Sequence, residues 1–185
     1  MTAAHFATHF ATLARYNRWA NGLLFAACEE AGEEVWRPEV GAFHGSVLGT
    51  LNHILVMDRL WLGRVVGRDF GFQGLDEIVH GDLAALAGAR EEFDDAIVAA
   101  VDELAEDDFA RVVEYAITGG GTAREPLWLL LAHLFNHQTH HRGQVTDALT
   151  RAGYEIPSLD LVAFWRAVGA DHAAESVGVS MAGVR

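Results

Sequence analysis

Apolar residues recur at helical spacing in four long blocks of this chain. The blocks span about residues 3–31, 46–67, 82–104 and 124–153. In each block the apolar positions fall largely on one face, which is typical of a helix that packs one side against a core. Four such helices joined by connections without low-complexity sequence predict an all-α protein, a four-helix bundle of up-down order.

Residues that are typical of helix ends mark the limits of these blocks. Gly32 follows the first block as a helix C-terminal glycine, Ser46 is a natural N-cap for the second, and Pro126 suits the first turn of the fourth. Before the fourth block, residues 110–126 combine β-branched residues with three consecutive glycines, which predicts a short β-hairpin or an extended loop. A short apolar segment at about 158–168 predicts a last helix that closes the bundle.

These elements predict one domain. We expect residues 1–170 to form the bundle and residues 171–185 to form a flexible C-terminal tail. The single cysteine, Cys28, cannot form an internal disulfide, and its apolar surroundings predict a core residue.

Charge and hydropathy narrow the class of protein. The formal net charge is −13, and all 13 basic residues are arginine. A surface this acidic repels phosphate backbones, so we expect no nucleic-acid partner. No apolar run is long enough to cross a bilayer, and the first ten residues lack the pattern of a signal peptide. We therefore expect a cytoplasmic protein without a membrane partner.

The chain has ten histidines, which are the candidate metal ligands. Four of them lie inside the fourth block, within a stretch of nine residues. These are His133, His137, His140 and His141. Residues four apart share a helix face, so the pair His133 and His137 and the pair His137 and His141 could each bind one metal ion. Burying several imidazoles together is costly unless each is hydrogen-bonded or liganded, which favours a metal site.

A third ligand must come from another helix. His53 stands out because it lies in the middle of the second block between apolar neighbours. His44 and His80 lie in glycine-containing connections and are interpreted as surface residues. His5 and His9 are four residues apart but lie close to the N-terminus.

Four stretches of sequence are similar to a known family. The chain resembles the DinB-like (damage-inducible) family of metal-binding four-helix bundles, which are related to bacterial thiol S-transferases. The likeness spans about residues 13–165 and rests on ARYNRWANGLLFAA, LNHILVMDRLWLGR, HLFNHQTHHRGQV and PSLDLVAFWR.

The resemblance implies an exposed metal held by His53, His137 and His141, with the remaining positions open to water or substrate. It favours His141 over His133 as the third imidazole. It also implies a homodimer packed through helices. Zinc and nickel are the leading candidates for the divalent metal, and iron, manganese and copper are further candidates.

The residues around the expected ligands are interpreted one by one. His133 is taken as a core or ligand-supporting residue and His140 as a surface or interface residue. Arg142 is expected to pair with a carboxylate of the bundle, and Gln144 to cap a neighbouring group. The alternative is that these two contact an anion or support the ligands. Asp58, five residues after His53, is not expected to bind the metal.

The leading functional hypothesis is a metal-dependent enzyme of the stress response. It would be a thiol S-transferase that uses a low-molecular-weight thiol, or a small hydrolase, acting on a small-molecule substrate. The alternative is a non-catalytic metal-binding or metal-sensing dimer. The chain has no His-Glu-x-x-His motif, which argues against a zinc protease.

Overall fold

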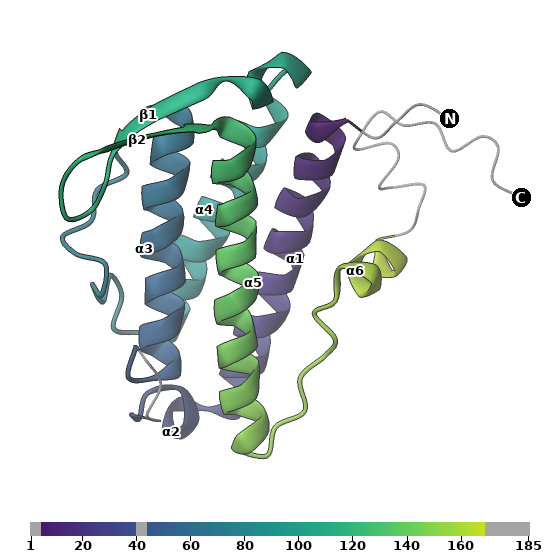
Figure 1. The fold of residues 1–185 in the computed structure, drawn as a ribbon. Coiled ribbons are helices and arrows are strands. Elements are labelled where there is room, and N and C mark those ends of the chain that lie inside the picture. The colour runs from purple at the N-terminus through teal and green to yellow at the C-terminus, as the bar shows by residue number, and fades with distance from the viewer. Residues whose placement is uncertain (1–4, 40–43, 169–185) are drawn as a thin grey trace, which may run out of the picture.

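A computed structural model describes residues 5–39 and 44–168 of the chain and has four long helices (Figure 1). The predicted bundle with a hairpin before its last long helix is confirmed. The expected tail, 171–185, lies outside the described residues. In chain order the elements are α1 (Phe6–Ala31), α2 (Glu33–Trp36), α3 (Val47–Val66), α4 (Leu83–Asp102), η1 (Glu106–Ala110), β1 (Val112–Ala116), β2 (Thr122–Pro126), α5 (Leu127–Arg151) and α6 (Leu161–Ala167).

Helix α1 packs against α4 and α5, and α3 packs against α5 and, less extensively, α4. Residues 67–82 cross from the end of α3 back along its side, as two contacts show. The amide of Asn52 donates to the carbonyl of His80 over 3.0 Å, and the ring of His53 lies 3.0 Å from the carbonyl of Leu75. This crossover makes α4 run in the same direction as α3 (Figure 1), whereas the predicted up-down order would make these two helices antiparallel.

The N-cap predicted at Ser46 is present, and Asp82 caps α4 in the same way. The hydroxyl of Ser46 accepts from the amide of Gly49 over 3.0 Å, and Asp82 accepts from the amide of Ala85 over 3.0 Å. Helix α5 begins at Leu127, three residues later than predicted, because the residues before it are paired in the hairpin.

The hairpin lies across the ends of α3 and α5 (Figure 1). Its strands are antiparallel, with Val112 opposite Pro126, and Gly119, Gly120 and Gly121 in the turn all have positive φ. The guanidinium of Arg64 on α3 donates to the carbonyl of Ala116 over 3.1 Å, which attaches the hairpin to the bundle.

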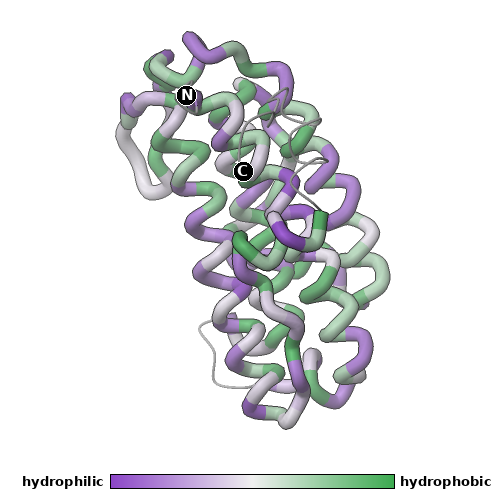
Figure 2. The backbone as a smooth tube through the Cα atoms, turned by 90° about the vertical axis from the view of Figure 1, so that its right-hand side faces the viewer, coloured by the Kyte–Doolittle hydropathy of each residue, from purple (hydrophilic) through white to green (hydrophobic). Residues whose placement is uncertain are grey.

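The core draws on all four long helices. Leu24, Leu55, Ile97 and Leu131 are each fully buried, and polar residues occupy the outward positions along the same helices (Figure 2). Cys28 lies in this core, and burial raises the pKa of its thiol to about 12, so it is an unreactive apolar side chain as expected. Within residues 5–39 and 44–168, no helix is long and apolar enough to cross a membrane.

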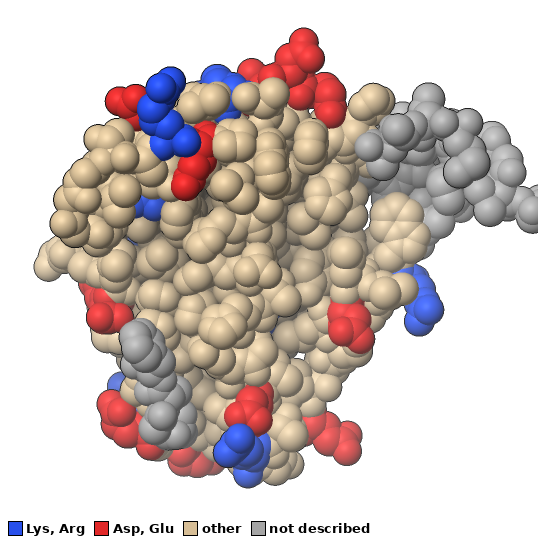
Figure 3. All heavy atoms as spheres, viewed as in Figure 1, with Lys and Arg blue, Asp and Glu red and all other residues tan. Residues whose placement is uncertain are grey.

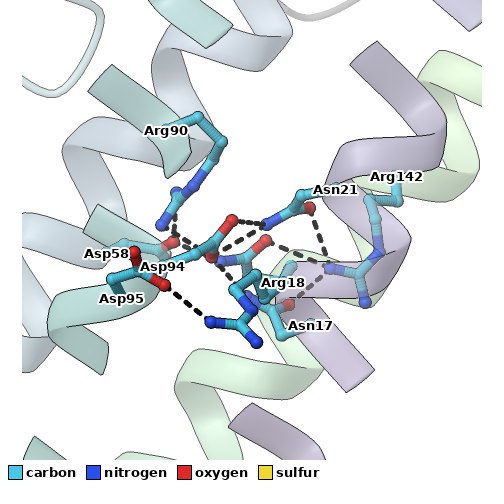
Figure 4. A network of polar contacts seen from close by, with 9 residues as sticks. Asn17, Arg18, Asn21, Asp58, Arg90, Asp94, Asp95 and Arg142 are labelled. Atoms are coloured by element: carbon cyan, nitrogen blue, oxygen red, sulfur yellow. Dashed lines mark hydrogen bonds and ion pairs between the residues drawn. The ribbon is translucent and has the colours of Figure 1, made fainter. Parts of the chain in front are cut away.

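A buried polar network links the helices through the core (Figure 4). Asp58 on α3 accepts from Arg90 on α4 over 2.6 Å and from the amide of Gln138 on α5. Arg90 also pairs with Asp94 over 3.0 Å, and all of these side chains are at most 3% exposed. Complete burial raises the pKa of Asp58 to about 7, although Arg90 acts in the opposite direction.

The same network reaches α1 through two asparagines. Asn17 and Asn21 donate to Asp94 over 3.1–3.2 Å, and their oxygens accept from Arg142 on α5. Arg142 therefore contacts amide oxygens, not the bundle carboxylate that the sequence interpretation expected. Each of the four long helices contributes to one connected set of hydrogen bonds, which fixes their relative positions.

We expect Asp58→Asn to lower the free energy of unfolding by about 3–5 kcal/mol, the usual cost of removing one partner from a buried ion pair. Arg90 would remain charged and keep only Asp94 as its carboxylate partner. Urea denaturation at a pH above the pKa of Asp58 measures the change.

Asp95→Asn is the matched control. Asp95 is on α4, the helix that carries Arg90 and Asp94, and pairs with Arg18 over 2.7 Å, but both side chains are more than half exposed. The expected change is below about 1 kcal/mol. An equal loss in the two variants would contradict a structural role for the buried network.

Candidate metal centre

The packing of α3 against α5 brings the three predicted ligands together. His53 projects from α3 and His137 and His141 from α5. Their ring centroids are 5.3 Å apart for His53 and His137, 4.7 Å for His53 and His141, and 4.3 Å for His137 and His141. The Nε2 atoms of His137 and His141 lie 3.1 Å apart. Helical spacing and the position of His53 thus identify three neighbouring imidazoles.

A fourth imidazole, His44, joins them. Its ring stacks on that of His53, with centroids 3.7 Å apart and an interplanar angle of 21°, and its side chain is 4% exposed. One nitrogen from each of His44, His53 and His141 lies within 4.8 Å of the others, so these three could also hold a metal ion. The interpretation of His44 as a surface residue is wrong.

Gly49 explains how His44 reaches this position. A Cβ at Gly49 would stand 2.1 Å from the carbonyl oxygen of His44, so only glycine lets the turn before α3 lie this close to the helix. Gly49 is visible in the sequence. Hydrophobic periodicity does not predict the path of the turn before α3, so the sequence alone could not show that this glycine allows the close approach.

Hydrogen bonds define which nitrogen each ring presents. Nδ1 of His53 lies 3.0 Å from the carbonyl oxygen of Leu75. A carbonyl oxygen only accepts, so Nδ1 carries the proton and Nε2 of the neutral ring keeps its lone pair. Nδ1 of His141 lies 2.8 Å from Oε1 of Gln144, which leaves Nε2 of His141 available in the same way. Metal-binding histidines are commonly held by such acceptors.

His44 is oriented by the residue next to Leu75. Its Nδ1 lies 3.4 Å from Oδ1 of Asp76, an exposed carboxylate. The crossover from α3 to α4 therefore supplies the acceptors for two of the four rings. No sequence pattern pointed to Leu75 or Asp76, because a backbone carbonyl and one exposed aspartate in an irregular segment carry no distinctive signal.

Burial keeps these imidazoles neutral. It lowers the pKa of His53 and His141, and it lowers that of His137 to about 3, with the adjacent His141 as the next contribution. Nδ1 of His137 is buried and has no hydrogen-bond partner among the described residues. Neutral imidazoles with converging Nε2 atoms fit a divalent ion that accepts nitrogen ligands.

The remaining residues of the motif take other positions. His133 is exposed and its ring lies 4.2 Å from that of Trp61, so it is not a core residue. His140 is also exposed, as expected for a surface residue. Gln144 orients His141 through Nδ1, so the alternative in which it supports a ligand describes its contact better than the capping interpretation.

The face of the bundle that carries α3 and α5 is largely uncharged. Figure 3 shows acidic and basic side chains gathered near the two ends of this face, with few between them. A small molecule that approaches the cluster from this side meets mainly uncharged surface.

Four long helices around one core, with clustered imidazoles between two of them, define a helical-bundle protein with a candidate metal centre. Residues 2–172 match the model of the DinB family, and the chain belongs to that family. Protein DinB of Bacillus subtilis (strain 168) is 28% identical over 165 residues, which cover 80% of this chain and 88% of that protein.

A solved structure has the same fold. The crystal structure of a DinB-like protein from Bacillus cereus ATCC 10987 matches with a TM-score of 0.57, covering 83% of this chain and 94% of that chain at 22% identity. This likeness supports the four-helix architecture and the hairpin, and the chemistry of the site rests on the residues described above.

Proposed function

We propose that this protein binds one divalent metal ion through His53, His137 and His141. The observation that carries the proposal is the 3.1 Å separation of the Nε2 atoms of His137 and His141. Two nitrogens that share a tetrahedral zinc ion lie roughly 3.4 Å apart, given Zn–N bonds of about 2.0–2.1 Å. Imidazole ligands favour zinc or nickel, and iron, manganese or copper would be accepted by the same donors.

We further propose that the bound metal serves a transferase that conjugates a low-molecular-weight thiol to an electrophile. A divalent ion held by three neutral ligands keeps its full charge and can lower the pKa of a bound thiol or water. In the conjugation a sulfur–carbon bond forms, the leaving group departs, and the thiol proton passes to solvent. The resemblance to thiol S-transferases supports this choice.

The grouped donors are imidazoles, and the nearby carboxylate, Asp76, lies against Nδ1 of His44. A bound ion would lower the pKa of a water molecule as well as that of a thiol, so the resemblance to thiol S-transferases is what favours the thiol. A homodimer packed through helices would suit this role in a stress response.

The metal assignment predicts near one divalent metal per chain in the native protein and loss of that metal in His53→Ala, His137→Ala and His141→Ala. Each variant removes one of the three nitrogens that hold the ion. Inductively coupled plasma mass spectrometry after supplying zinc or nickel measures the content. His140→Ala is the matched control, because it is exposed on the same helix, and it should keep its metal.

Retention of one equivalent at native affinity in His53→Ala would overturn the ligand set. A native protein that takes up no metal would overturn the proposal as a whole.

The transferase predicts metal-dependent conjugation of 2-mercaptoethanol to monochlorobimane, followed by fluorescence. We expect the rate above background to vanish in His137→Ala and to persist in His140→Ala. Metal-loaded protein with no rate above background across a panel of thiols would refute thiol transfer. Ester hydrolysis by the same sample would then support the hydrolase, and its absence would support the non-catalytic metal-binding alternative.

Gln144→Ala should weaken metal binding about 10- to 100-fold, the usual effect of removing an acceptor that orients a ligating histidine. The reason is that Nδ1 of His141 would lose its 2.8 Å contact and the ring its fixed direction. Competition with a colorimetric chelator measures the affinity. Gln73→Ala, an exposed glutamine in the crossover, is the control and should bind as the native protein does. Equal affinities in both variants would contradict the orienting role.

A further inference from the structure

We infer that His44 is a fourth protein ligand, which closes the coordination position that the three helix-borne histidines leave open. The inference rests on the proposed metal binding and concerns how that site admits other molecules. A three-histidine site offers a position to water or substrate, whereas four imidazoles complete a tetrahedral shell.

The arrangement of the two stacked rings carries this inference. The rings of His44 and His53 are nearly parallel and 3.7 Å apart. Their Nδ1 atoms both face the crossover, one toward Oδ1 of Asp76 and the other toward the carbonyl of Leu75. Because acceptors hold both rings by Nδ1, both present Nε2 on the opposite side.

His141 lies beside both rings. Its ring centroid is 5.3 Å from that of His44 and 4.7 Å from that of His53. One nitrogen of each of the three rings lies within 4.8 Å of the other two. A metal ion lies in the plane of each imidazole that binds it, and the rings of His44 and His53 are nearly parallel, so His44 would reach the ion that His53, His137 and His141 bind by rotating out of this stack.

His44 differs from the other ligands in what holds it. The three predicted ligands are on long helices fixed by the core and the buried network. His44 is in the turn before α3, held by a 2.9 Å hydrogen bond from the amide of Ser46 to its carbonyl and by the close approach at Gly49. It is the ligand that can leave without disturbing a helix, so an incoming thiol would take its place.

The test replaces His44 by cysteine in the full chain and loads the protein with cobalt(II). A ligand at position 44 would place sulfur on the ion, so His44→Cys should gain a sulfur-to-cobalt charge-transfer band in the near ultraviolet. His80→Cys, in the crossover and outside the cluster, should bind cobalt without the band. The native cysteine is buried in the core and supplies no background.

Extended X-ray absorption fine structure of the cobalt protein gives a second readout. We expect four imidazoles in the native protein and three in a His44→Ala variant that is folded by circular dichroism. That variant should also show thiol binding at a lower 2-mercaptoethanol concentration than the native protein, by about tenfold or more, since no histidine must be displaced.

Three outcomes separate the two proposals. Cobalt bound in His44→Cys without a sulfur band, or three imidazoles in both native and His44→Ala proteins, would overturn the role of His44 and leave the three-histidine site intact. A native protein that binds no cobalt would overturn both. A sulfur band in His44→Cys but not in His80→Cys would establish the fourth ligand.

Discussion

The buried ion pair between Asp58 and Arg90 constrains the rest of the structure, because charges removed from water must find partners at defined positions. Gln138 and Arg142 extend the pair to α5, and through Arg142 the network reaches α1. The register of α5 against its neighbours satisfies these groups together. That register places His137 and His141, which flank Gln138 within one helical turn, opposite His53. A network that looks structural therefore also sets the geometry of the candidate metal centre.

The crossover from α3 to α4 also orients two rings of the candidate metal centre. A connection of this length costs chain entropy, and a shorter link to an antiparallel helix would cost less. Its return along α3 brings Leu75 and Asp76 beside the rings of His53 and His44. These acceptors fix the protonated nitrogen of each ring. The fold thus uses an irregular segment, held against a rigid helix, to orient two imidazoles of the cluster.

Burial of the imidazoles sets their protonation state. Desolvation lowers the pKa of the clustered rings, so they stay neutral at physiological pH and keep the lone pairs that a metal needs. Several polar rings packed together, one with an unpartnered buried nitrogen, would be a poor arrangement for stability alone. The chain belongs to the DinB family, and neighbouring histidines of this cluster could bind a metal ion.

Periodicity in the sequence determined the four helices, and four-residue spacing determined that His137 and His141 share a face, because both follow from local helix geometry. The position of His53 in the middle of a helix was visible in the sequence, and the family resemblance selected it as the third imidazole. The tertiary structure alone decided that His44 joins the cluster, that Leu75 and Asp76 orient two rings, and that Asp58 belongs to a buried network. The reason is physical: these contacts join residues from turns, a crossover and separate helices, whose distances in space depend on how the helices pack and not on their spacing along the chain.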